Sequence, residues 1–258
     1  MFNVAFLVLI NVWSGLGLSP THETNRRSFF KLSPLLISSP VVASASLPPA
    51  SRDVEVGGGY DLLSVKRGAA EGDVIYPESI EGVWNCDRFV ARVEGDTFQA
   101  SEAYRCLGGR LNPLQDGSAE KFETRFIRSP IIATPGVVVD RGFEISSRAK
   151  TKDVQWAVED PNFLGFENKV KLIVVKRTVE VPSDKGFGFD ELLRVEDGII
   201  TRAVQVKRRY RRSFDDQGNR VVEGLEIMKT FRVLDGIAGT ELPTSTVKSQ
   251  IRLLRPSS

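Results

Sequence analysis

The chain has 258 residues, with 35 Lys and Arg against 33 Asp and Glu, and a single histidine, His22. A formal net charge of +2 provides no overall field to attract nucleic acid or an anionic membrane, so such a role would need a local patch. His22 lies in the leader defined below, so a processed protein lacks His-based catalysis and imidazole metal sites. The two cysteines cannot form a four-thiolate site. We therefore expect no metal and no cofactor, and an enzyme only through carboxylate, lysine or tyrosine chemistry.

Residues 4–18 form an apolar run that ends in small residues. A membrane-spanning helix needs about 20 apolar residues, so this shorter run is typical of the hydrophobic core of a secretory signal. Because no lysine or arginine precedes the run, a retained signal anchor stays an alternative. We expect residues 1–18 to be a signal for the endoplasmic reticulum.

A second signal follows in residues 24–45. Arg26 and Arg27 precede two aromatic residues, a lysine and a mildly apolar stretch, and Ala43 and Ala45 form an A-x-A processing site. This order resembles a twin-arginine export signal. Two export signals in series resemble the tripartite presequence of a nucleus-encoded protein in an alga with a complex plastid, which implies delivery to the thylakoid lumen. We expect residues 1–45 to be a disordered targeting presequence.

Residues 46–75 contain Pro48, Pro49 and the glycines 57–59 among scattered charges. This composition is typical of a flexible lead-in, with at most a short helix at residues 60–66. We expect the folded domain to span residues 76–256.

From residue 76 onward, apolar and polar residues alternate in short runs that turn-forming residues separate. This period of two predicts antiparallel strands, and we find no amphipathic helix longer than two turns. In run 137–147, for example, the inward set is Val137, Val139, Phe143 and Ile145. Run 170–181 has mixed parity, which predicts either burial on both faces or a bulge. The predicted strands are 82–93, 97–105, 121–128, 137–147, 153–159, 169–181, 189–196, 199–212, 219–234 and a last run that ends near Leu253.

The links between these runs are short, as in Asp197-Gly198, and Asp-Gly between apolar runs is a strong hairpin signal. A long series of strands joined by hairpins must protect its edges, and closure into a barrel does so. We therefore predict an all-β fold, an antiparallel up-and-down β-barrel over residues 76–256. A two-layer β-sandwich is the alternative.

Gly82-Val83-Trp84 opens the first predicted strand of the domain. It resembles the Gly-x-Trp element of lipocalin-type barrels, in which the tryptophan closes one end and a basic residue of the last strand packs over it. The resemblance implies this role for Arg252 or Arg255 and implies an interior pocket for an apolar ligand. The alternative is that Trp84 is an ordinary core residue.

Cys86 and Cys106 are separated by 19 residues, a spacing that suits two neighbouring antiparallel strands. In an oxidising lumen, a bridge between them would stabilise the domain by about 3 kcal/mol. The alternative is two buried thiols that never meet.

The densest charge cluster of the chain lies in residues 202–212. On a strand, Arg208 and Arg212 share one face, while Lys207, Arg209 and Arg211 project from the other. One interpretation is a solvated strand end that discourages edge pairing, and the other is a docking patch for an acidic partner or lipid headgroups. The candidate patch consists of Arg202, Lys207, Arg208, Arg209, Arg211 and Arg212.

Several short motifs are distributed along the domain, among them Tyr76-Pro77-Glu78, Gly82-Val83-Trp84, Thr134-Pro135-Gly136, Asp160-Pro161-Asn162, Phe189-Asp190-Glu191-Leu192 and Ile251-Arg252-Leu253-Leu254-Arg255. Together they resemble the family called domain of unknown function 6816, found in cyanobacteria and plastids. The resemblance covers residues 76–256 and implies residence in a plastid or thylakoid. It provides no catalytic residues to assign, because the family has no established activity.

These features favour a non-catalytic binding or accessory protein of the thylakoid lumen, with a barrel pocket for an apolar small molecule such as a pigment or a lipid. The alternative is a docking module that places the basic strand end on a thylakoid protein complex. An enzyme ranks last. We expect no nucleic-acid partner and no transmembrane segment in the mature form.

Overall fold

The computed structural model describes residues 55–56, 59–64, 70, 72–131, 136–167, 169–184 and 186–256. Contacts divide the chain into two units, Met1–Pro48 and Pro49–Ser258, and all described residues belong to the second. The predicted targeting residues lie outside the described part of the chain, namely Arg26, Arg27, Ala43 and Ala45.

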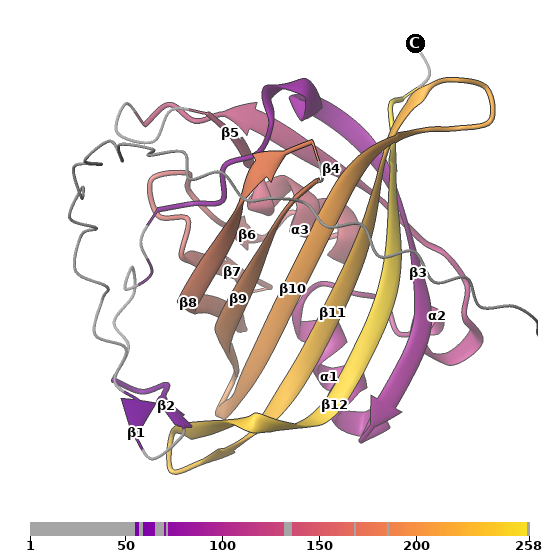
Figure 1. Cartoon of the computed structure of the whole chain (residues 1–258). Helices are drawn as coiled ribbons and strands as arrows, with labels where there is room; N and C mark the ends of the chain where they lie inside the picture. The colour runs from indigo at the N-terminus through magenta and orange to yellow at the C-terminus, as the bar shows by residue number, and fades with distance from the viewer. Residues whose placement is uncertain are drawn as a thin grey trace, which may run out of the picture. The chain divides into compact units, whose positions relative to one another are not determined.

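A single antiparallel sheet dominates the domain (Figure 1). Its strands follow the order β5-β4-β3-β12-β11-β10-β9-β8-β7-β6, and β2, which pairs with β1, joins at β12. The bounds are β1 Glu55–Val56, β2 Gly59–Asp61, β3 Gly82–Gly95, β4 Glu120–Arg128, β5 Val137–Val139, β6 Val154–Gln155, β7 Phe163–Phe166, β8 Val170–Ser183, β9 Gly186–Asp197, β10 Ile200–Phe214, β11 Arg220–Leu234 and β12 Ile237–Leu254.

The sheet curls into a half-barrel (Figure 1). Strand β3, the first long strand, pairs with the last strand, β12, so segments from the two ends of the domain sequence are neighbours in the sheet. The opening lies between β5 and β6, the two edge strands, which have only three and two residues. Short edges leave few backbone groups for another chain to pair with. The prediction of an antiparallel all-β fold is confirmed, whereas the alternative of two packed sheets is wrong.

Helices lie on the concave side of the sheet (Figure 1). Two of them connect β3 to β4, and the third connects the two edge strands, β5 and β6. Their bounds are α1 Thr97–Cys106, α2 Asn112–Asp116 and α3 Arg141–Ala149, and a 3-10 turn covers Glu78–Ile80.

Residues 97–105 form most of helix α1, so the strand predicted there is wrong. Asp96 begins the helix by accepting hydrogen bonds from the backbone N–H groups of Phe98 and Gln99, at 2.9 and 3.1 Å. An aspartate at this position satisfies donors that the first helical turn leaves unpaired. Ala100, Ala103, Tyr104 and Leu107 are buried and recur at helical spacing, and Cys106 at the end of the helix is also buried.

The strand predicted at 137–147 is correct only for its first three residues. Asp140 ends it, because its Oδ1 accepts a hydrogen bond from the N–H of Phe143 at 2.8 Å and begins α3. Only Ile145 and Arg148 of this helix are buried, so hydrophobic periodicity gives little sign of it. Both α1 and α3 exceed the two-turn limit that we expected.

Part of the predicted lead-in is folded onto the sheet. Asp61 of β2 pairs with Ile237 of β12, where a short helix was expected. Leu62 is fully buried and joins a small apolar cluster. One member of that cluster, Ala203, precedes Val204 of the main core on β10, so the two clusters lie on opposite faces of the sheet. Residues 59–64 therefore cover part of the convex face.

The main core fills the concave side and includes Trp84 and Met228. Strand β8 contains the irregularity predicted for run 170–181, because its register with β9 shifts between Val174 and Lys176. Val174 packs in the main core and Val175 in the convex cluster, so both faces of this strand are also buried. After the shift, Arg177 points to the concave side, where it contacts Glu191.

Candidate functional site

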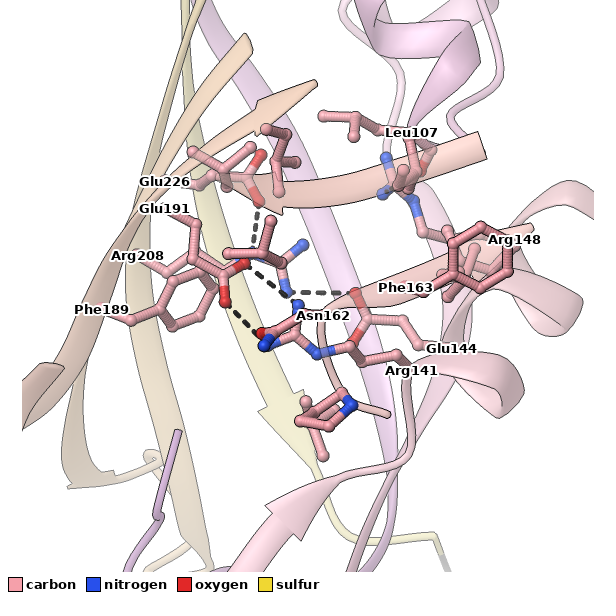
Figure 2. Close-up of a pocket in the computed structure, with 18 of the residues that line it drawn as sticks. Leu107, Arg141, Glu144, Arg148, Asn162, Phe163, Phe189, Glu191, Arg208 and Glu226 are labelled. Atoms are coloured by element: carbon pink, nitrogen blue, oxygen red, sulfur yellow. Dashed lines mark hydrogen bonds and ion pairs between the residues drawn. The ribbon is translucent and has the colours of Figure 1, made fainter. Parts of the chain in front are cut away.

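A cavity of about 90 Å³ lies between α3 and the concave face of strands β8 to β11 (Figure 2). The segment 161–163 borders it where the chain enters β7. Much of the wall is apolar, and its aliphatic and aromatic members include Leu164, Leu172, Val174, Phe189, Leu193 and Val206. Charged side chains of both signs also reach the cavity: Arg141, Glu144, Arg148, Glu191, Arg208 and Glu226.

Helix α3 supplies half of these charged groups. Arg141, Glu144 and Arg148 are spaced by three and four residues, so they share one face of the helix. That face is turned toward the sheet, and the three side chains are 17%, 12% and 2% exposed. Ion pairs therefore dock this helix on the strands, with Ile145 as its single buried aliphatic residue.

The first ionic cluster is centred on Arg208 of β10 (Figure 2). Its Nη1 donates to Oε1 of Glu144 at 3.0 Å, and its Nε donates to Oε2 of Glu226 at 2.5 Å. Thr124 donates a further hydrogen bond to Glu144 at 2.9 Å, and Arg88 donates to Glu226. The cluster thus ties α3 to strands β3, β4, β10 and β11.

The same cluster continues to Glu120, which is fully buried. Its Oε2 accepts hydrogen bonds from Nη2 of Arg148 at 3.2 Å and from the hydroxyl of Tyr104 at 2.8 Å, and Nη1 of Arg88 lies 3.6 Å away. Arg148 also donates to the carbonyl of Leu107 at 2.8 Å. Helices α1 and α3 are therefore linked through one carboxylate.

A second ionic cluster lies at the other end of α3. Arg141 donates from both Nη atoms to the two carboxylate oxygens of Glu191, at 3.0 and 2.8 Å, and from Nη2 to Oδ1 of Asp73 at 3.0 Å. Nε of Arg177 donates to Glu191 at 2.6 Å. The second cluster contains two arginines and two carboxylates, and the first contains three arginines and three carboxylates. Each cluster is therefore formally neutral.

The arginines keep these carboxylates ionised. Burial alone would raise the pKa of Glu191, but attraction to Arg141 and Arg177 outweighs burial and lowers the pKa to about 2. Burial is outweighed in the same way at Glu226, where Arg88 and Arg208 lower the pKa to about 2. A general acid or base works best with a pKa near the operating pH, so neither group suits that role at neutral pH.

Burial also suppresses the nucleophiles near the core. It raises the pKa of the Tyr76 and Tyr210 hydroxyls and of the Cys86 and Cys106 thiols. A raised pKa leaves little of the reactive anion at neutral pH. Within the described residues, no group of three or more His, Cys, Asp or Glu side chains could hold a metal ion.

The guanidinium groups of the cavity carry more donors than the protein uses. Each arginine has five N–H groups, and the contacts above occupy three in Arg141, two in Arg148 and two in Arg208. The Nε atoms of Arg141 and Arg148 are buried and have no hydrogen-bond partner. A buried donor without an acceptor costs about 1–3 kcal/mol in stability.

The six basic residues of the candidate docking patch do not form one surface. Arg208 lies in the cavity, on the same face of β10 as Val204, Val206 and Tyr210 of the core. Arg202 is only 8% exposed. The interpretation of residues 202–212 as one docking patch is therefore wrong for these two arginines.

The outward members of the cluster pair with acidic residues of two nearby strands, β8 and β11. Arg209 binds Glu180 at 2.6 Å, and Arg211 binds Glu223 at 2.7 Å. The cluster also includes two exposed members, Lys207 and Arg212, the second of which donates to the carbonyl of Ser183 at 3.1 Å. Pairing with these acids reduces the positive field of the strand end.

The contact inferred from Gly82-Val83-Trp84 is present and involves Arg255. Cζ of Arg255 lies 4.0 Å from the centre of the Trp84 ring, and Trp84 Nε1 donates to the carbonyl of Ile80 at 2.6 Å. Arg252 is exposed and lies opposite Glu223 in the sheet, so it does not take this role. Trp84 is also a core residue, with 2% of its surface exposed.

Cys86 and Cys106 are free thiols, so the predicted bridge is not present. The expectation assumed two neighbouring strands, but Cys106 is the last residue of α1 while Cys86 lies on β3. The sulfur of Cys106 instead lies 3.9 Å from Oδ2 of Asp197. The two cysteines correspond to the alternative of separate buried thiols.

Sequence reasoning missed most of the cavity residues. Asp140 as a cap, followed by Arg141, Glu144 and Arg148 at helical spacing, was a usable signal for α3. No sequence signal indicated that Glu226 points to the cavity. A strand is expected to turn its apolar residues inward, but Leu225 and Ile227, which flank Glu226, lie on the opposite face of β11.

A family model described as "Domain of unknown function (DUF6816)" matches residues 68–257. The chain belongs to this family. The match contains the strands from β3 to β12 and every residue of the cavity, so the DUF6816 domain includes the whole candidate site. Comparison with the curated proteins and comparison with the solved structures each give no match. In the described part of the DUF6816 chain, no helix is both long and apolar enough to cross a bilayer.

Proposed function

We propose that the DUF6816 domain is a non-catalytic binding protein and that the cavity beneath α3 is its ligand site. The observation that carries the proposal is the surplus of buried guanidinium donors in a largely apolar cavity. The lowered pKa of Glu191 and Glu226 supports binding rather than catalysis, because neither carboxylate exchanges protons near neutral pH.

The ligand that fits best is a small amphiphile with one carboxylate. A carboxylate accepts several hydrogen bonds from arginine, often two at once, and leaves the apolar part of the molecule for the aliphatic wall. The volume of about 90 Å³ accommodates the acidic group and a few carbon atoms. Typical pockets for whole ligands measure about 300–1,000 Å³, so a pigment or a lipid would enter with its acidic end only.

Two further parts of the functional account are also proposals. The packing of Arg255 on Trp84 supports a lipocalin-like relationship for the half-barrel. Docking on a thylakoid complex is the alternative function, and it now depends on the exposed side chains Lys207, Arg209, Arg211 and Arg212.

Isothermal titration calorimetry of the full chain with hexanoate and with hexanol tests the ligand class. We expect hexanoate to bind and hexanol to bind at least about tenfold more weakly, since only the carboxylate uses the spare donors. Decanoate is the third arm. Equal affinities for decanoate and hexanoate indicate a small acid, and tighter binding of decanoate indicates the end of a longer amphiphile.

A pair of matched variants assigns the binding to the cavity. Arg148→Lys keeps the charge and removes donors from the cavity, so we expect hexanoate to bind at least about tenfold more weakly. Arg125→Lys makes the same change outside the cavity, at a side chain that pairs with Asp140, and should leave the affinity unchanged. Equal binding of hexanol, or an unaffected Arg148→Lys variant, contradicts the proposal.

We also propose the thylakoid lumen as the place where the protein acts, on the basis of the signals in residues 1–45. A fluorescent fusion of the full chain, expressed in an alga with a complex plastid, tests this. Replacing Arg26 and Arg27 by lysine should stop the fusion at the stroma, because the twin-arginine pair is required for the last membrane. Lumenal delivery of that variant, or a cytosolic wild type, contradicts the proposal.

A further inference from the structure

A second cavity, of about 370 Å³, lies beside the first and has the opposite chemistry. The two cavities share Pro161 and Asn162, which belong to the Asp160-Pro161-Asn162 stretch noted in the sequence. Arginines reach the first cavity, whereas none of the described residues that line the second is basic. Its volume falls within the range of about 300–1,000 Å³ that is typical of small-molecule sites.

Two buried oxygen acceptors in this second cavity have no hydrogen-bond donor. Asn162 is 5% exposed, and its Nδ2 donates to the carbonyl of Ala70, so its Oδ1 is the atom left without a partner. The Asp73 side chain is 6% exposed, and its Oδ2 likewise has none. Buried polar atoms are almost always paired in folded proteins, so two orphan acceptors at one cavity indicate a missing donor.

The contacts of Asp73 explain why one of its oxygens stays free. Its Oδ1 accepts hydrogen bonds from the N–H of Val74 at 2.7 Å and from Arg141 at 3.0 Å. Arg141 and Arg177 both donate to Glu191, and Nη2 of Arg177, which has no hydrogen-bond partner, lies 3.9 Å from Oδ1 of Asp73, beyond hydrogen-bond distance. Oδ2 is therefore a buried acceptor without a hydrogen-bond donor, in a side chain that lines the cavity.

We propose that this second cavity binds a primary alkylammonium group. An ammonium has three N–H donors and no acceptor, which matches Oδ1 of Asn162, Oδ2 of Asp73 and a further carboxylate. Glu159 lines the same cavity and supplies an acidic side chain that favours a cation. The remaining wall includes Ile131, Val138 and Val158, against which a short methylene chain can pack.

Titration of the full chain with butylamine, protonated at pH 7, tests the proposal. We expect saturable binding that weakens as salt is added, because Glu159 is exposed and its attraction is screened. Tetramethylammonium has the same charge without N–H donors and should not bind measurably. Absence of butylamine binding, equal binding of tetramethylammonium, or displacement of butylamine by Ca²⁺ overturns the proposal.

Three variants test the location of the site, so the conclusion does not require that any single variant folds normally. Asp73→Asn should weaken butylamine binding at least about tenfold, but it also disturbs the pair with Arg141. Glu159→Gln alters only an exposed side chain and should weaken binding about threefold. Glu167→Gln is the matched control, because Glu167 is exposed and does not line the cavity. Unchanged affinity in Glu159→Gln, or an equal loss in Glu167→Gln, contradicts the assignment.

The test of the ammonium site can be separated from the test of the carboxylate site beneath α3. Glu159→Gln should leave hexanoate binding unchanged, since Glu159 does not line the first cavity. Failure of butylamine to bind with hexanoate binding intact therefore overturns only the ammonium site.

Discussion

The two faces of the curled sheet use arginine in different ways. On the concave face, Arg208 is held between two buried carboxylates, and one of them belongs to α3. On the convex face, the next residue, Arg209, pairs with Glu180 in contact with water. Buried pairs depend strongly on both partners, whereas exposed pairs contribute little. Arg208 thus belongs to the ionic network that lines the cavity, whereas the adjacent residue Arg209 belongs to the solvent-exposed surface.

The largest expected effect comes from removing the arginine of the concave face. Arg208→Met leaves Glu144 and Glu226 without one of their cationic partners, and we expect a loss of about 3–5 kcal/mol in the free energy of unfolding. Chemical denaturation followed by circular dichroism measures this loss. The matched variant Arg209→Met should leave the denaturation midpoint unchanged within error. Similar losses in both variants would show that the two faces do not differ in this way.

Acid should weaken the concave network next. The pKa of Glu191 and of Glu226 is lowered from 4.5 to about 2 by folding, so their stabilising effect is complete above about pH 4.5. It is lost as the pH falls toward 2, because the unfolded chain then binds protons more readily. Denaturation midpoints measured from pH 7 to pH 3 should decline below pH 4.5. The double variant Glu191→Gln, Glu226→Gln should have a lower midpoint at pH 7 and a shallower decline, and a midpoint that does not change with pH in the wild type would contradict the account.

The smallest of these effects concerns the start of α3. Asp140→Ala removes the cap of the helix and its ion pair with Arg125, and we expect a loss of about 1–2 kcal/mol in stability. Asp140→Asn keeps the capping oxygen and should recover at least half of the loss. Hydrogen exchange at the amides of residues 141–149 reports whether the loss is local to this helix. Faster exchange spread evenly over the sheet would argue against a local role.

The strand pattern and the antiparallel fold were predictable because most strands alternate against one apolar core. The prediction failed where charge replaced hydrophobicity as the buried feature, as in α3, whose inward face consists mainly of Arg141, Glu144 and Arg148. A period-of-two reading of 137–147 placed Val137 and Val139 correctly and then continued past Asp140, although that residue ends the strand.

The candidate site was less predictable than the fold, for a physical reason. Glu191, Arg208 and Glu226 lie on three neighbouring strands. Glu191 and Arg208 pair with α3, and Glu226 pairs with Arg88 and Arg208, all across long separations in the sequence. Nothing in a single sequence indicates which arginine meets which carboxylate across such separations. The contact between Trp84 and Arg255 could be predicted, because the motif Gly82-Val83-Trp84 suggested a basic partner near the end of the domain.

A double-mutant cycle between Glu144 and Arg208 tests most directly whether ion pairs hold α3 over the concave face. The four proteins are the wild type, Glu144→Met, Arg208→Met and the double variant, compared by their free energies of unfolding in denaturant. The account predicts a coupling energy of at least about 1 kcal/mol, because the two side chains are in contact and only 14% and 12% exposed. Losses that add to within about 0.3–0.5 kcal/mol would contradict it.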